Sequence, residues 1–226
     1  MEGEWDAYYS RLATFNDPYR QVGKTKYGAP VGVEQLGKIS THIARALSLT
    51  VEDSVLDLGC GNGLLTRNIA EKVYEIIGVE KNKDLYDEAV RQTSVDNIFY
   101  INCDILEFIE AGKGIKKGYL YEVLQHIPYK ELPRLIKNQK SILGKGGKLF
   151  IGGIPDEERK WRFYYTKSQR EFYYNCLMEG REALGYWYKS DFLMYVCGQL
   201  NVGCRILRQP KKLYTSHYRF DCILTF

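Results

Sequence analysis

Three acidic side chains follow three apolar runs of this chain, at the points where buried strands would end. Asp57 lies at the end of the run that starts at Val55, Glu80 ends the next run, and Asp104 follows the third. A glycine-rich loop, residues 59–63, comes directly after the first run. Because the carboxyl ends of parallel strands meet at one edge of an open sheet, we expect these carboxylates to surround one ligand pocket.

The position of Glu80 suits the recognition of a ribose. It lies about 20 positions after Asp57, where a dinucleotide-binding fold places the acidic residue that accepts from ribose hydroxyls. A carboxylate offers two acceptor oxygens to two adjacent hydroxyl donors. A pyrophosphate-binding loop would carry a third glycine where this chain has Leu64, so the loop disfavours a dinucleotide. The alternative is that Glu80 and Asp104 are solvated strand ends or helix caps.

Strands and helices alternate in the part of the chain that must position these groups. Helical spacing of Leu36, Ile39, Ile43 and Leu47 predicts a helix over residues 33–49. Further helices are predicted over 84–92 and over 132–143, where Pro133 is tolerable only in the first turn. The apolar runs predict strands at 55–58, 74–79, 97–101, 119–123 and 147–151. This alternation predicts a parallel sheet with right-handed crossovers.

The last third of the chain changes this rhythm. A helix is predicted from about Asp191 to Leu200, followed by strands at 203–207 and 218–226. The final strand alternates, which suits an antiparallel strand with one face on the core. Its inward residues would be Tyr218, Phe220, Cys222, Leu224 and Phe226.

Composition bounds the class of protein. The chain has 226 residues, of which 45% are hydrophobic, enough for one sizeable core and a single domain over 1–226. The net charge of +4 comes from basic residues spread along the chain, which does not by itself indicate nucleic acid. Six cysteines without a C-x-x-C pair indicate reduced thiols. No run approaches the roughly 18 apolar residues of a membrane span, so we expect a cytoplasmic protein that does not enter membranes.

The string Asp-Leu-Gly-Cys-Gly-Asn-Gly at 57–63 resembles the first motif of the class I S-adenosylmethionine-dependent methyltransferases. The resemblance covers residues 33–154 closely and the final hairpin in outline. It implies an α/β fold: a Rossmann-like seven-stranded mixed sheet, parallel with a C-terminal antiparallel hairpin, flanked by helices. It also implies S-adenosyl-L-methionine as cofactor and no metal. The implied cofactor-binding residues are Asp57, Leu58, Gly59, Cys60, Gly61, Asn62, Glu80, Lys81, Cys103, Asp104, Ile105 and Tyr121, with Asp104 on the adenine amino group and Ile105 against the ring.

Three residues are candidates for removing a proton from the methyl acceptor. In the family the segment 121–127 faces the acceptor, and it holds Glu122 and His126, whose unperturbed pKa of about 6.5 suits proton transfer. Packing against a helix is the equal alternative for His126. If the strand at 203–207 runs parallel to the core strands, His217 also borders the acceptor pocket.

The same geometry brings Tyr218 and Arg219 to the acceptor pocket. An anionic acceptor needs an arginine. The alternative is that Arg219 and Asp221 form a pair on the solvent face of an alternating strand.

Two aromatic segments flank the core. Residues 155–189 contain ten aromatic side chains, and we expect a helical cap over the pocket in which Trp161 and Tyr165 contact the substrate. The same composition would suit the interface of a homodimer. Residues 1–32 are expected to form a second cover over the cofactor through Gln21 and Lys24. The C-terminal helix and hairpin occupy 190–226.

The segment after the fourth strand lacks the Asn/Asp-Pro-Pro-Tyr/Phe tetrapeptide of amino-methylating enzymes. The sequence therefore favours methylation of a hydroxyl oxygen on a small molecule or saccharide, with no nucleic acid as partner. Two alternatives remain open at this point. One is an enzyme acting on RNA or a protein side chain, and the other is a non-catalytic methyltransferase-like binding subunit.

Overall fold

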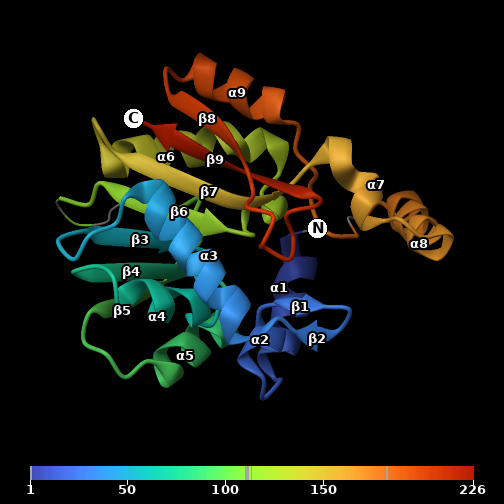
Figure 1. Ribbon diagram of the computed structural model, residues 1–226, viewed down its shortest axis with the longest axis horizontal. Helices are drawn as coiled ribbons and strands as arrows, with labels where there is room; N and C mark the ends of the chain where they lie inside the picture. Colours follow the sequence, from blue (N-terminus) through green and yellow to red (C-terminus); the bar gives the residue numbers. More distant parts are fainter. Residues whose placement is uncertain (1, 110–111, 113, 182) are drawn as a thin grey trace.

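The computed structural model describes residues 2–109, 112, 114–181 and 183–226. Its centre is a seven-stranded sheet in the order β5-β4-β3-β6-β7-β9-β8 (Figure 1). The first five strands in this order, from β5 to β7, pair in parallel. Strand β9 runs antiparallel to both β7 and β8. The predicted Rossmann-like mixed sheet with a C-terminal antiparallel hairpin is confirmed. The strands are β3 (Ser54–Leu58), β4 (Glu75–Glu80), β5 (Ile98–Asn102), β6 (Lys117–Tyr121), β7 (Lys148–Pro155), β8 (Gly203–Arg208) and β9 (Arg219–Thr225).

Helices cover both faces of this sheet. Successive strand residues point to opposite faces, so Val55 packs with α3 and α4, whereas Leu56 packs with α6 and α9. Each face therefore has its own apolar layer. The helices flanking the sheet are α3 (Gly32–Leu47), α4 (Leu64–Ala70), α5 (Lys83–Gln92), α6 (Leu132–Leu143) and α9 (Ser190–Gln199).

The local sequence explains why these helices start and pack where they do. The four apolar residues that predicted α3 are all buried against the sheet. Pro133 lies in the first turn of α6, where its missing N–H costs no helical hydrogen bond. Asn82 caps α5, since its side chain accepts from the backbone N–H of Leu85 at 3.0 Å. That cap fixes the chain immediately after Glu80.

Strand β9 differs from the expectation of one inward and one outward face. Residues from Arg219 to Leu224 are all buried, because β9 lies between β7 and β8 with helices over both faces of the sheet. The interpretation that Arg219 and Asp221 form a pair on the solvent face is therefore wrong, since the two side chains are 3% and 0% exposed. Their polar groups are buried at the end of the sheet instead.

Two segments lie outside the sheet and its helices. The N-terminal cover, residues 2–31, contains α1 (Glu2–Ala13), α2 (Pro18–Gln21) and a small hairpin of β1 (Thr25–Lys26) and β2 (Ala29–Pro30). The aromatic arm, residues 155–181 and 183–189, contains α7 (Lys160–Phe163) and α8 (Lys167–Met178). Helix α8 projects away from the sheet (Figure 1). No helix in the described ranges is long and apolar enough to cross a membrane.

Short 3₁₀ turns join some of these elements. They lie at Leu124–His126 and Tyr129–Glu131, between β6 and α6, and at Glu157–Arg159, before α7. The first of them carries two polar side chains of the pocket described next.

Candidate functional site

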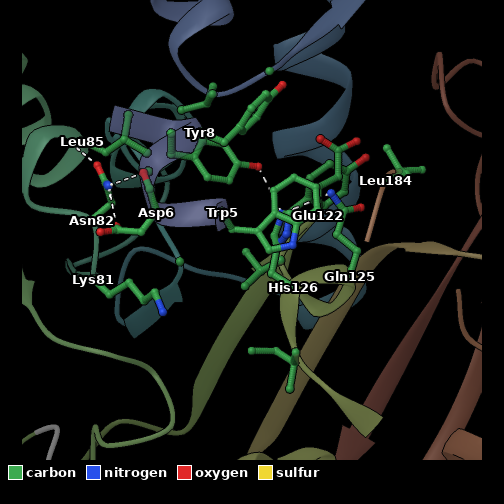
Figure 2. A pocket seen from close by; sticks show the side chains of 18 of the residues that line it. Trp5, Asp6, Tyr8, Lys81, Asn82, Leu85, Glu122, Gln125, His126 and Leu184 are labelled. Carbon is green, nitrogen blue, oxygen red and sulfur yellow. Dashed lines mark hydrogen bonds between the residues drawn. The ribbon is translucent and has the colours of Figure 1, made fainter. Parts of the chain in front are cut away.

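A cavity of about 1190 Å³ opens at the carboxyl ends of the parallel strands. Its lining comes from the glycine loop, from the residues after β4, β5 and β6, from the N-terminal cover and from the base of the aromatic arm. Ordinary ligand pockets measure roughly 300–1000 Å³, so this one is larger than the usual pocket for a single ligand. Figure 2 shows part of its wall, where α1 faces the loops that follow the strands.

The glycine loop is held against the end of β4. The N–H groups of Gly59 and Cys60 both donate to the carbonyl oxygen of Val79, at 2.8 and 3.1 Å. Gly59 has a φ of +77°, and an added Cβ would lie 2.6 Å from Cγ2 of Val123. Only glycine combines this backbone with this close approach.

Replacing Gly59 by alanine is expected to lower the free energy of unfolding by about 2–4 kcal/mol, because strain at positive φ adds to overpacking against Val123. Gly37 is the matched control, since it lies inside α3 with no neighbour within 4 Å of an added Cβ. Gly37→Ala should raise stability by about 0.5–1 kcal/mol. Urea denaturation measures both, and equal effects of the two substitutions would contradict the proposed constraint.

Both carboxylate oxygens of Glu80 are held by backbone N–H groups. Its Oε1 accepts from the backbone N–H of Asn82 at 2.8 Å, and its Oε2 from the N–H of Gly61 at 2.9 Å. Burial raises the pKa of this carboxyl, and the two N–H donors act against that rise. Each oxygen keeps a further lone pair, so the group can accept from two adjacent hydroxyls of a ligand.

Asp57 lines the cavity, but its hydrogen bonds go to neighbouring elements of the fold. Its Oδ2 accepts from the hydroxyls of Thr66, at 2.7 Å, and Tyr119, at 2.6 Å. Burial raises the pKa of Asp57 to about 6, while both hydroxyl donors act in the opposite direction. Because Thr66 lies in α4 and Tyr119 in β6, this carboxylate ties the strand end, the helix and the neighbouring strand together.

The third acidic residue lies beside an apolar wall. Asp104 accepts from the N–H of Leu106 at 2.9 Å, and its other oxygen lies 3.4 Å from Nζ of Lys81. The neighbouring Ile105 is 6% exposed and lines the cavity. A carboxylate for a diol, a second for an amino group and an apolar side chain for a ring form a set that fits an adenosyl group.

Most of the predicted cofactor residues reach the cavity. Its lining includes Asp57, Gly59, Cys60, Gly61, Asn62, Glu80, Lys81, Asp104, Ile105 and Tyr121. Leu58 and Cys103 do not, since both pack in the apolar layer under α6 and α9. No group of three or more His, Cys, Asp or Glu side chains in the described part of the chain could hold a metal ion.

Helix α1 closes one side of the cavity, over the residues that follow β4 and β6. Oδ1 of Asp6 accepts from the side chain of Asn82 at 2.6 Å, and the Trp5 ring lies 4.5 Å from that of His126 (Figure 2). The Tyr9 hydroxyl lies 3.1 Å from Nε2 of His126. The sequence analysis assigned no role to Asn82. Asn82 could have been found from its place two residues after Glu80, at the start of a helix.

The two residues expected to anchor the N-terminal cover both do so. The Gln21 side chain donates to Glu88 at 2.9 Å and accepts from Asn62 at 2.7 Å. Lys24 forms an ion pair of 2.8 Å with Glu122, in which both side chains are largely buried. The cover is therefore attached to the glycine loop, to α5 and to the end of β6.

The same ion pair weakens Glu122 as a base. Burial opposes ionisation of this carboxyl, but Lys24 and Arg219 together hold its pKa below the usual value. A carboxylate stabilised in its charged form accepts a proton poorly at neutral pH. Glu122 also has a φ of +61°, so its backbone is held in the left-handed region at the edge of the cavity.

His126 lies partly buried under α1 and is held as a neutral imidazole. Burial lowers its pKa to about 3, and the charges of Arg219 and Lys81 act in the same direction. Its Nε2 faces Tyr9, whereas Nδ1 has no hydrogen-bond partner among the described residues. The ring lines the cavity, and its low pKa keeps it neutral at ordinary pH.

The other predicted acceptor residues divide into two groups. Tyr218 and Arg219 line the cavity, together with Gln125 and Tyr214. His217, Trp161 and Tyr165 do not: each side chain is exposed outside the cavity lining. Strand β8 does run parallel to the core strands, but the turn before β9 directs Tyr218 inward and leaves His217 outside. The arm residues that do line the cavity are Phe163, Phe172, Arg181, Ala183, Leu184 and Tyr186.

The chain is similar to known proteins over the part that builds this cavity. Residues 55–147 match the sequence profile of a methyltransferase domain. A ubiquinone biosynthesis O-methyltransferase of Coxiella burnetii is 33% identical over 129 residues, which cover 56% of this chain and 53% of that enzyme. The ribosomal RNA small subunit methyltransferase A of Caldanaerobacter subterraneus is 33% identical over 92 residues, or 39% and 34% of the two chains. The chain thus matches about half the length of the first relative and a third of the second.

Solved structures match over nearly the whole chain. The DhpI-SAM-HEP complex has a TM-score of 0.66 at 14% identity, covering 97% of this chain and 95% of that one. Magnesium protoporphyrin IX methyltransferase (ChlM) from Synechocystis PCC 6803 with bound SAM has a TM-score of 0.61 at 14% identity, covering 99% and 92%. These likenesses show the fold. With the motif and the donor set around the cavity, the matching domain makes residues 55–147 similar to the class I S-adenosylmethionine-dependent methyltransferases.

Proposed function

We propose that this protein transfers a methyl group from S-adenosylmethionine to a hydroxyl oxygen of a small molecule or saccharide. The observation that carries the proposal is one continuous cavity of about 1190 Å³ with two chemically different ends. One end carries Glu80, Asp104 and Ile105, and the other is lined by aromatic side chains of the arm and by Arg219. Glu122 and His126 lie at the end of β6, between them in the strand order.

The residues at the first end would hold the cofactor. Glu80 accepts from the ribose hydroxyls, Asp104 from the adenine amino group, and Ile105 packs against the ring. When bound, S-adenosylmethionine supplies a methyl group on a positively charged sulfur. The N-terminal cover then excludes water, because Lys24 and Gln21 tie it to the loops around the site.

His126 is the best candidate for the proton acceptor. Its low pKa makes it a weak base, but it is neutral and therefore ready to accept. A hydroxyl becomes more acidic as its oxygen gains a methyl group, so a weak base near that oxygen suffices. Glu122 is better suited to orient Lys24 and the cover than to take the proton.

A small acceptor is favoured by the covers on either side of the cavity. RNA or a protein side chain would need access to an open surface, and RNA binding would need a contiguous basic one. Helix α1 instead lies across the cofactor-side loops. Oxygen as the acceptor atom is supported by the absent Asn/Asp-Pro-Pro-Tyr/Phe tetrapeptide and by the named O-methyltransferase relative.

A methyl-transfer assay tests this proposal. S-adenosylmethionine carrying a labelled methyl group is incubated with the protein and, separately, with small-molecule, RNA and protein fractions of a lysate. The proposal predicts label in the small-molecule fraction, in an ether that survives mild alkali. Label confined to RNA or protein would contradict it, and lack of cofactor binding would support the non-catalytic alternative.

A further inference from the structure

Arg219 lies on the acceptor side of the cavity. It opens β9 and pairs with Pro155 at the end of β7, so it is two strands beyond β6 in the order β6-β7-β9. Strands are about 4.8 Å apart, which places its backbone roughly 10 Å from the end of β6. The acidic residues suited to the adenosyl group follow β4 and β5, on the opposite side of β6.

The guanidinium group of Arg219 is buried among neutral partners. The side chain is 3% exposed, and its Nη1 donates to Oε1 of Gln125 at 2.6 Å and to the carbonyl oxygen of Gly153. Its Nε has no hydrogen-bond partner among the described residues. None of the ion pairs found in the described ranges involves this arginine.

The two carboxylates nearest to Arg219 along the chain and across the pocket are already bound by other groups. Glu122 forms its ion pair with Lys24. Asp221 lies 2.7 Å from Nε2 of His42 and accepts from Gly153 and from the side chain of Gln209. Arg219 acts electrostatically on Glu122 but has no carboxylate of the described residues in direct contact, so its unpaired Nε is left for an anionic ligand that reaches it.

The surroundings of this charge are aromatic. The guanidinium carbon lies 5.0 Å from the centre of the Tyr218 ring, and the Phe163 ring lies 4.7 Å from that of Tyr218. Leu184 packs against the same aromatic cluster and also lines the cavity. The acceptor end thus combines one fixed cation with flat apolar surfaces, an arrangement that fits a sugar or aryl body carrying an oxyanion.

We propose that Arg219 binds an oxyanion of the methyl acceptor. The acceptor is then a hydroxylated acid, whose anionic group is a carboxylate or a phosphate ester, and not a neutral alcohol. This rests on the proposed function and narrows its substrate class. Arg219 is then a specificity-determining residue that orients the acceptor, and it takes no part in proton transfer.

Paired probes test the proposal by calorimetry on the protein saturated with S-adenosylhomocysteine. Each pair shares a body and differs in charge: 3-hydroxybenzoate with 3-hydroxybenzamide, and glucose 1-phosphate with methyl glucoside. At least one anion should bind at least about tenfold more tightly than its neutral partner, and which pair shows this distinguishes a carboxylate from a phosphate ester. In Arg219→Gln the preference should fall to about one. The matched control Arg205→Gln removes an exposed arginine of β8 and should keep it.

Several results would overturn the proposal. One is that the unmodified protein binds the neutral and the anionic probe of each pair with equal affinity, or binds neither anion. This measurement uses the unmodified protein alone, so it remains valid if Arg219→Gln does not fold. Another is an anion preference that survives Arg219→Gln. A third is a loss of S-adenosylhomocysteine affinity in Arg219→Gln, which would assign the arginine to the cofactor. Failure of the unmodified protein to bind S-adenosylhomocysteine would instead remove the proposed function itself.

Discussion

Glu80→Gln is expected to weaken binding of S-adenosylhomocysteine at least about 100-fold while leaving the protein folded. The amide keeps one acceptor oxygen for a backbone N–H but loses the charge and the second acceptor that two ribose hydroxyls require. Hydrogen bonds to a charged group contribute about 1.5–3 kcal/mol each, and two of them account for a factor of this size. Calorimetric titration measures the affinity, and circular dichroism checks the fold.

The matched control for this change is Glu75→Gln. Glu75 opens the same strand, β4, at the opposite end from the cavity, and it accepts from the Ser54 hydroxyl at 2.8 Å. Its replacement should leave the affinity unchanged within about twofold. An equal loss in both variants would mean that the strand, and not the Glu80 carboxylate, determines binding. An unchanged affinity in Glu80→Gln would remove Glu80 from the cofactor site.

His126→Ala is expected to lower kcat about 100-fold while S-adenosylhomocysteine still binds within a few-fold of the normal affinity. The imidazole lies on the acceptor side of the cofactor carboxylates, so its loss removes a proton acceptor and not a cofactor contact. His126→Gln is the companion variant, since its amide can still reach the Tyr9 hydroxyl and hold α1 in place. If both variants lose cofactor affinity as strongly as Glu80→Gln, His126 supports the cover and is not a base.

The pKa of His126 gives this prediction a pH signature. Burial lowers the pKa to about 3, so the imidazole is neutral above that value and protonates only below it. At saturating S-adenosylmethionine, kcat should therefore stay level as the pH falls from 8 to 5. An ordinary histidine, with a pKa of about 6.5, would reduce kcat about tenfold per pH unit below that value. A decline of that form in the unmodified protein, absent from His126→Gln, would contradict the buried neutral state.

The core of the fold was predictable because its signals are local. The spacing of Leu36, Ile39, Ile43 and Leu47 requires a helical stripe, and each apolar run between turns requires a buried strand. The three acidic residues follow from the same argument, since parallel strands place their carboxyl ends together. Glu80 and Asp104 accordingly line one cavity, as their spacing suggested.

The acceptor side could not be predicted in the same way, because it depends on contacts between distant segments. Lys24 and Glu122 are 98 positions apart, and nothing local indicates that they form a buried ion pair. The burial of Arg219 depends on β8 adding outside β9, which turns an alternating strand into a central one. In the arm, α7 has only four residues, too few for periodicity to show that Phe163 faces the cavity and Trp161 faces solvent.

The N-terminal cover was predictable only in part. Its role was inferred from its aromatic content, and Gln21 and Lys24 do contact the loops around the cavity. The hairpin of β1 and β2 was not predicted, because strands of two residues carry no pattern. The division into cover, core, arm and C-terminal hairpin, and the possible homodimer, stay predictions.

We expect the glycine loop, Glu80 and Asp104 to form an adenosyl site without a pyrophosphate subsite. Titration of the unmodified protein with S-adenosylhomocysteine, followed by NAD⁺ under the same conditions, tests it most directly. We expect one molecule of S-adenosylhomocysteine bound per chain. NAD⁺ at a hundredfold excess should not displace it, because NAD⁺ should bind at least about 100-fold more weakly. Binding of NAD⁺ with equal or greater affinity, or no binding of S-adenosylhomocysteine, would contradict it.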